Sequence, residues 1–167
     1  LTPIGIAALL YFIPQLTNRP SASRPLAAFG LGTLMLGGGW VGLNASAPLP
    51  AWLVAASMAA GTLVMIPVLA TAINLRRTLA GGIRSVEAPG PVRFFGFAAV
   101  ALLVAGVVSG IVSFPVTNRS VQLTYFIVAV RSLWLYAFIA MAAFGAIYHI
   151  LPKLSGIAWP SSGMVNA

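Results

Sequence analysis

Few residues in this chain could carry out chemistry. Its 167 residues include one histidine, His149, one acidic residue, Glu87, and no cysteine. The lack of cysteine excludes disulfides, thiolate metal sites and iron–sulfur clusters. One imidazole and one carboxylate are too little for a metal site or an acid–base pair, so the chain by itself has almost no catalytic groups.

Arg131 has the most unusual setting of the polar residues, because it lies inside the last long apolar segment, residues 121–154. Counted from Leu123, it lies about 12 Å into a membrane span, where we expect a buried and costly guanidinium. Glu87 is on the opposite side of the membrane in the topology derived below. Three interpretations remain open: Arg131 binds backbone carbonyls, extends to a lipid phosphate, or meets an acidic group of a neighbouring subunit.

Composition indicates a polytopic membrane protein. Hydrophobic residues make up 60% of the chain and charged residues 6%, and the mean hydropathy is +1.01. A water-soluble domain needs more polar surface than this. Apolar runs of about 20 residues, the length that spans hydrocarbon, recur along the chain. The net charge of +8 lies between these runs, so it indicates topology and not a nucleic-acid-binding surface.

The hydropathy pattern predicts an all-α bundle of about five membrane helices. They form one domain, residues 1–154, followed by a short polar tail, residues 155–167, in which Trp159 is expected to anchor at the interface. The first helix is too short to span a bilayer alone and Leu1 is not an initiator methionine, so we expect the natural chain to begin earlier. The expected helices cover residues 1–14, 26–43, 52–75, 94–114 and 121–151.

Basic residues are distributed unequally between the two sides of this bundle. One side has two in the connector after the first helix, four in the loop between the third and fourth helices, and Lys153 near the end. The other side has one, Arg119. By the positive-inside rule, the C-terminus is cytoplasmic, and we expect a bacterial inner membrane. The connector and loop residues are Arg19, Arg24, Arg76, Arg77, Arg84 and Arg93.

Small residues four positions apart are expected to let the helices approach closely. Such pairs occur in the second, third and fourth expected helices. Pro67 is expected to kink the third helix. The pairs are Gly38 with Gly42, Ser57 with Gly61, and Gly106 with Gly110.

Several motifs resemble, in order and spacing, the catalytic subunit I of heme–copper oxidases. The closest resemblance is to C-family (cbb-type) cytochrome c oxidases and the related nitric oxide reductases, and it covers residues 2–154. It implies a membrane bundle of the subunit I type. The motifs are T-P-I-G-I-A-A-L-L-Y-F-I-P-Q-L-T-N-R-P (residues 2–20), L-P-A-W (49–52), Pro67, Ile73-Asn74, Thr78-Leu-Ala-Gly81 and G-A-I-Y-H-I-L-P-K-L (145–154).

The chain departs from this family at the metal-binding positions. The resemblance puts the family's copper-ligating histidine pair near Gly42 and Leu43, its axial heme ligands at Val130 and Ser132, and a glutamate near Ser109. Heme needs histidine, methionine, cysteine or tyrosine, and copper here needs imidazole. We therefore expect no heme, copper or other metal bound by this chain, although a heme in a neighbouring subunit remains open.

Arg131 and His149 are the candidates for lipid or partner contact. His149 is expected at the membrane interface, in an aromatic belt with Tyr148; the alternative is an axial ligand for a heme in a partner chain. The resemblance makes two of the three interpretations of Arg131 more specific. When it binds backbone carbonyls, it would fill space that hemes occupy in the family; when it meets an acidic group of a neighbouring subunit, that group could be a heme propionate.

These residues favour a non-catalytic, cofactor-free membrane subunit of a respiratory or electron-transfer complex. It would derive from an oxidase subunit I and act as a scaffold or assembly element, with other integral membrane subunits and lipids as partners. The alternative is part of a split cytochrome c oxidase or nitric oxide reductase whose metal ligands come from another chain. A transporter or channel is disfavoured, because permeation sites normally need buried polar residues.

Overall fold

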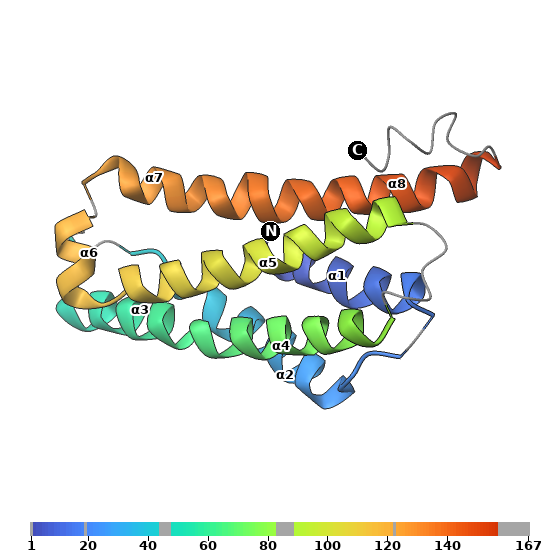
Figure 1. Cartoon of the computed structure of the whole chain (residues 1–167). Coiled ribbons are helices and arrows are strands. Elements are labelled where there is room, and N and C mark those ends of the chain that lie inside the picture. Colours follow the sequence, from blue (N-terminus) through green and yellow to red (C-terminus); the bar gives the residue numbers. More distant parts are fainter. Residues whose placement is uncertain (1, 19, 44–47, 83–88, 122, 157–167) are drawn as a thin grey trace.

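The computed structural model describes residues 2–18, 20–43, 48–82, 89–121 and 123–156, which are almost entirely helical and contain no strand (Figure 1). The predicted all-α fold is therefore confirmed for this part of the chain. Arg19, Arg84, Glu87 and Trp159 lie outside it. The helices are α1 (Thr2–Leu16), α2 (Arg24–Gly38), α3 (Ala51–Leu63), α4 (Met65–Gly82), α5 (Pro89–Val112), α6 (Pro115–Val121), α7 (Tyr125–Ser132), the π-helix η2 (Leu133–Ala140) and α8 (Met141–Ser155).

Three helices in the described ranges are long and apolar enough to cross a membrane. They are Ala51–Ala80, which comprises α3 and most of α4, then Gly90–Val112 within α5, and Tyr125–Ser155, which runs from α7 through η2 to α8. Helix α1 is a shorter apolar helix, and α2 has 15 residues. The predicted count of five spans is therefore not confirmed.

Several residues expected in loops lie on helices. Helix α4 continues through Arg76 and Arg77 to Gly82, because the run from Leu75 to Ala80 has neither glycine nor proline. Arg93 lies on α5, which begins at a proline, a residue favoured in the first helical turn. Arg119 lies on α6 and not in an extended loop.

The second helix is shorter than expected. Helix α2 ends at Gly38 and not near Leu43, since three successive glycines weaken the helix at that point. Gly42 lies beyond the helix with a φ of 111°. Among the described residues, no atom lies within 4 Å of a Cβ built on Gly38 or Gly42, so this part of the chain does not form the expected packing face of these two glycines.

Other small residues do lie at close helix contacts. Gly106 of α5 faces Val68 of α4, Gly110 of α5 faces Met65, and Gly61 of α3 faces Ser113. A Cβ added at any of these glycines would clash with the facing side chain. The α5 glycines therefore set how closely α3–α4 approach α5.

Helix α5 is the centre of the bundle. It packs against α1, α3, α4, α6, α7, η2 and α8, and 44% of its membrane span is buried, compared with 11% for Tyr125–Ser155. Figure 1 shows the long α7–α8 helix along one side of the molecule, with α6 joining it to the end of α5. The core between α1, α4, α5 and η2 contains Ile6, Leu9, Ile13, Val68, Leu75, Phe95, Leu102 and Phe138.

Two of the long helices are irregular: one has a break between α3 and α4, and the other contains a π-helix between α7 and α8. The break between α3 and α4 is at Val64, one turn before Pro67, because proline has no N–H to donate to the preceding turn. The π-helix η2 interrupts the last long helix over eight residues, Leu133–Ala140. A π-helical segment changes which side chains share a face, and such segments are frequent at functional sites.

Candidate functional site

A polar cavity lies where the segment after α2 meets α3, α5, α6 and α7. Its volume is about 190 Å³. The residues that line it come from distant parts of the chain, so only the fold brings them together. The polar ones are Ser57, Ser109, Ser113, Asn118, Arg131 and Trp134; the others are Val41, Gly42, Leu43, Met58, Val112, Ile127 and Val130.

Arg131 lies at this cavity on the same face of the last long helix as Ile127 and Trp134. The residue is exposed on the surface of the chain, so the other described residues do not bury its charge. The physical reason is that little of this helix is covered by the rest of the bundle. Within the described part of the chain, its guanidinium has no hydrogen bond or ion pair, so none of the described carbonyls is its acceptor.

Ser109 of α5 is held by a tryptophan. Trp134 Nε1 donates to Ser109 Oγ at 2.8 Å, which joins η2 to α5. Ser113 Oγ donates to the Ser109 carbonyl at 2.8 Å, so the Ser113 proton is already used. The Ser109 hydroxyl proton takes part in no hydrogen bond among the described residues, and it can therefore donate into the cavity.

Ser57 and Asn118 complete the polar lining. Ser57 is 3% exposed, and its Oγ accepts from the backbone N–H of Leu43 at 3.1 Å. The Asn118 Oδ1 atom is buried and has no hydrogen-bond partner in the described residues. An unsatisfied buried polar atom costs about 1–3 kcal/mol, unless a water or a ligand pairs with it.

The positions that the resemblance assigns to metal ligands converge on this cavity. Gly42, Leu43 and Val130 all line it, as does Ser109 at the position of the family's glutamate. Ser132 is not among the lining residues. These residues belong to three separate segments and were selected by motif spacing alone. In the structure they line the same cavity.

A comparison with known families tests the resemblance itself. The family described as Cytochrome C and Quinol oxidase polypeptide I matches residues 1–167. The chain belongs to the cytochrome c and quinol oxidase polypeptide I family. None of the curated proteins matches it. The resemblance to heme–copper oxidase subunit I is thereby confirmed at the level of the family, whose members work in multi-subunit respiratory complexes of membranes.

Members of the cytochrome c and quinol oxidase polypeptide I family usually bind heme, and this cavity does not fit that group. The cavity is partly open to the surface, so the test of fit is the set of ligand atoms in its lining. Glycine, leucine and valine have no side-chain ligand atom for heme iron or copper. The described residues also contain no group of three or more His, Cys, Asp or Glu side chains that could hold a metal ion.

His149 lies on α8, away from the cavity. Its ring contacts Phe12 of α1 edge to face, with centroids 5.7 Å apart, and its Nε2 is buried without a hydrogen-bond partner among the described residues. Tyr148 instead stacks on Phe94 of α5 at 5.2 Å. The two neighbours therefore pack against different helices, and the Nε2 atom of His149 does not face outward toward lipid or another chain.

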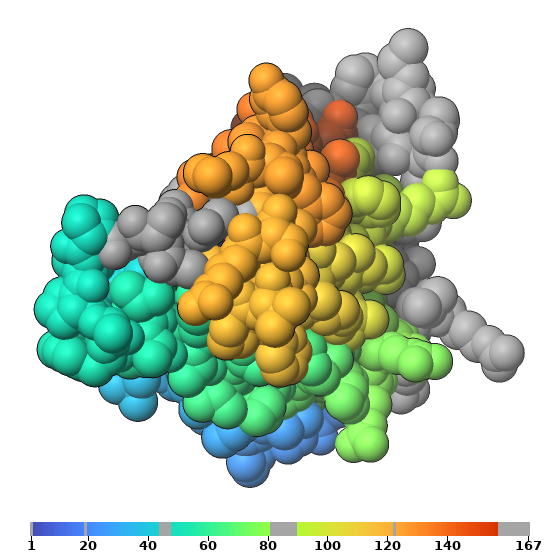
Figure 2. Space-filling view, turned by 90° about the vertical axis from the view of Figure 1, so that its left-hand side faces the viewer, coloured from blue at the N-terminus to red at the C-terminus, as the bar shows by residue number. Residues whose placement is uncertain are grey.

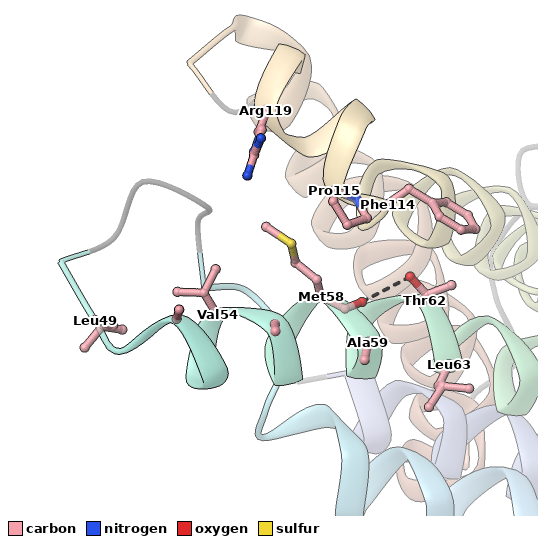
Figure 3. Close-up of a pocket in the computed structure, with 11 residues that line it drawn as sticks. Leu49, Val54, Met58, Ala59, Thr62, Leu63, Phe114, Pro115 and Arg119 are labelled. Carbon is pink, nitrogen blue, oxygen red and sulfur yellow. Dashed lines mark hydrogen bonds between the residues drawn. The ribbon is translucent and has the colours of Figure 1, made fainter.

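A second, larger hollow lies between α3 and α6, with a volume of about 810 Å³ (Figure 3). Figure 2 views the end of the molecule where α3 and α6 lie next to each other. Most of the lining is apolar, and Thr62 Oγ1 already donates to the Met58 carbonyl at 3.0 Å. The side chain of Arg119 extends from α6 over the groove as its one charged group. The apolar lining comprises Leu49, Ala51, Val54, Ala55, Met58, Ala59, Leu63, Phe114 and Pro115.

Proposed function

We propose that this chain is a non-catalytic, cofactor-free membrane subunit of a respiratory or electron-transfer complex, derived from a C-family oxidase subunit I. The observation that carries the proposal is the cavity at the family's metal-ligand positions. Gly42, Leu43 and Val130 line it, and none of them can bind heme iron or copper. A chain that keeps the family's helices without these ligands can still assemble with other subunits.

The scaffold role is supported by the surface of the last long helix. Only 11% of the Tyr125–Ser155 span is buried within the chain, which leaves a continuous apolar face for neighbouring membrane subunits. The contacts of α5 with the surrounding helices support a single membrane domain, residues 1–154. The large exposed residues of this helix include Tyr125, Phe126, Val128, Leu135, Tyr136, Phe144 and Ile147.

The proposed orientation has the C-terminus in the cytoplasm of a bacterial cell. Helix α4 ends, α5 begins and α8 ends at the same end of the bundle, and α6 lies at the other end (Figure 1). Arg76, Arg77, Arg93 and Lys153 belong to the first end, and Arg119 to the second. This distribution is what the positive-inside rule requires of a cytoplasmic first end.

Lipid is the second proposed partner, in the groove between α3 and α6. The apolar lining suits an acyl chain, and Arg119 at its edge suits the phosphate of the same phospholipid. The groove opens on the end of the bundle assigned above to the outer leaflet.

The experiment that tests the main proposal measures heme and partners on the same sample. We expect the purified chain to have no heme band in a reduced-minus-oxidised spectrum, and other membrane subunits to co-purify after mild detergent extraction. Heme in a one-to-one ratio with the isolated chain would overturn the proposal. A chain that purifies alone from native membranes would remove the scaffold role.

The alternative is one part of a split oxidase or nitric oxide reductase. It is favoured by the open face of Tyr125–Ser155, against which another chain could bring heme and its ligands. Oxygen or nitric oxide reduction by the co-purified complex, lost when this chain is deleted and the other subunits still assemble, would support the alternative over the scaffold.

A further inference from the structure

We propose that the cavity around Arg131 is a binding site for a small oxyanion, of the size of formate, nitrite or an acidic side chain's carboxylate. This inference goes beyond the scaffold role and does not depend on it. It concerns the polar side chains that line this cavity and the ligand that they could bind together.

The first step is the charge of Arg131. Its guanidinium has five N–H donors and, in the described part of the chain, no acceptor for any of them. It lines the cavity inside a span of high hydropathy, where a cation without a counter-charge is costly. The chain's one acidic residue, Glu87, lies outside the described residues, so none of the described side chains is acidic. No described side chain can therefore supply the counter-charge, and we expect an anion from outside the chain to do so.

The second step is the set of hydroxyl groups beside it. Ser109 and Ser57 each accept a hydrogen bond, from Trp134 Nε1 and from the Leu43 N–H. Neither donates to another described residue, so both hydroxyl protons can turn toward a ligand. Because each oxygen accepts from a neighbouring donor, the oxygen has a defined position about which its proton can rotate. A cation with two positioned hydroxyl donors is an arrangement that favours an anion.

The third step is Asn118. Its Oδ1 atom is buried without a partner among the described residues. A carboxamide oxygen accepts hydrogen bonds and cannot pair with an anion, so Asn118 joins the site when its side chain rotates its NH₂ group into the cavity that it lines. An oxyanion in the cavity would supply the counter-charge for Arg131.

Size limits what can bind. A cavity of about 190 Å³ has room for a carboxylate-sized anion with one or more waters. The same chemistry has two sources, a free anion or an aspartate or glutamate side chain of a neighbouring subunit. Either source would neutralise Arg131, and the two are separated by the experiment below.

The test is a titration of the detergent-solubilised full chain with sodium formate against sodium chloride at matched ionic strength, followed by isothermal calorimetry. We expect saturable binding of formate. Arg131→Gln is expected to weaken it at least about tenfold, and Ser109→Ala about threefold. Arg24→Gln is the matched control, because it removes the same charge at the start of α2, away from this cavity, and it should bind formate as the unchanged chain does.

Four outcomes decide the proposal. Formate binding that depends on Arg131, both in the isolated chain and in the co-purified complex, supports a free anion. Binding in the isolated chain that disappears in the complex supports a partner's carboxylate at the same site. The absence of saturable formate binding to the unchanged chain would overturn the site. Equal heats for formate in the unchanged chain and in Arg131→Gln would overturn it as well, with folding of the variant checked by circular dichroism.

Discussion

The Asn74 carboxamide of α4 forms two hydrogen bonds with the backbone of Ser23, 51 positions earlier in the chain. Oδ1 accepts from the Ser23 N–H at 2.9 Å, and Nδ2 donates to the Ser23 carbonyl at 3.1 Å. Thr78, one helical turn later, accepts from the Ala22 N–H at 3.1 Å. Asn74 is completely buried. These three bonds attach the α1–α2 connector to α4, and Ser23 then caps α2 through the Leu26 N–H.

Replacing Asn74 with leucine should destabilise the bundle. The variant keeps the branched shape of the side chain but leaves the Ser23 N–H unpaired, while the Ser23 carbonyl still accepts from the Ala27 N–H; we expect a cost of about 2 kcal/mol. The measurement is unfolding in detergent, followed by circular dichroism. Ile73→Leu, at an exposed neighbouring position, is the control and should unfold as the unchanged chain does. Equal stability of Asn74→Leu would show that the connector is held by other contacts.

Two glycines of α5 should respond oppositely to the same substitution. A Cβ at Gly106 would clash with Val68, whereas no atom lies within 4 Å of a Cβ at Gly96. We expect Gly106→Ala to destabilise the chain by about 1–3 kcal/mol. Gly96→Ala should be neutral or stabilise by up to about 1 kcal/mol, because alanine favours the helix.

In the same unfolding assay, a double variant tests whether the clash with Val68 causes the effect of Gly106→Ala. Adding Val68→Ala to Gly106→Ala removes the clashing side-chain atoms and should recover part of the lost stability. If the double variant is as unstable as the sum of the single variants, the close approach of α4 and α5 is not the cause.

The bond between Trp134 and Ser109 should appear as coupling between the two residues. Trp134→Phe and Ser109→Ala each remove the 2.8 Å hydrogen bond from η2 to α5. In a double-mutant cycle, we expect an interaction free energy of about 1 kcal/mol. Ser113→Ala is the control for Ser109, since its hydroxyl bonds within α5. A coupling near zero would mean that this contact does not hold the last helix to α5.

Arg119 should determine how much phospholipid the chain retains. Arg119→Gln removes the one charge over the apolar groove between α3 and α6, and we expect fewer phospholipids bound per chain by native mass spectrometry. Arg24→Gln removes an equal charge at the start of α2, away from the groove, and should leave retention unchanged. A loss of lipid that is the same in both variants would point to net charge and not to the groove.

The sequence by itself determined the class of the protein. Apolar length and composition require a helical membrane protein, because a span must satisfy its backbone hydrogen bonds internally. Motif order and spacing were enough to identify the family, since they do not depend on how the helices pack. They also place Gly42, Leu43, Val130 and Ser132 at the family's metal-ligand positions, which stays a prediction.

Contacts between distant segments were decided only by the tertiary structure. The sequence could not tell that Gly106 packs and Gly38 does not, because this depends on where α2 ends and which face α5 turns to α4. It gave no signal for the buried Oδ1 of Asn118. It placed Arg131 inside a span but could not tell how much of it the chain covers, because this depends on the neighbours of the helix, and the rest of the chain covers little of the last one. Helix periodicity is local information, whereas a shared cavity is a property of five segments at once.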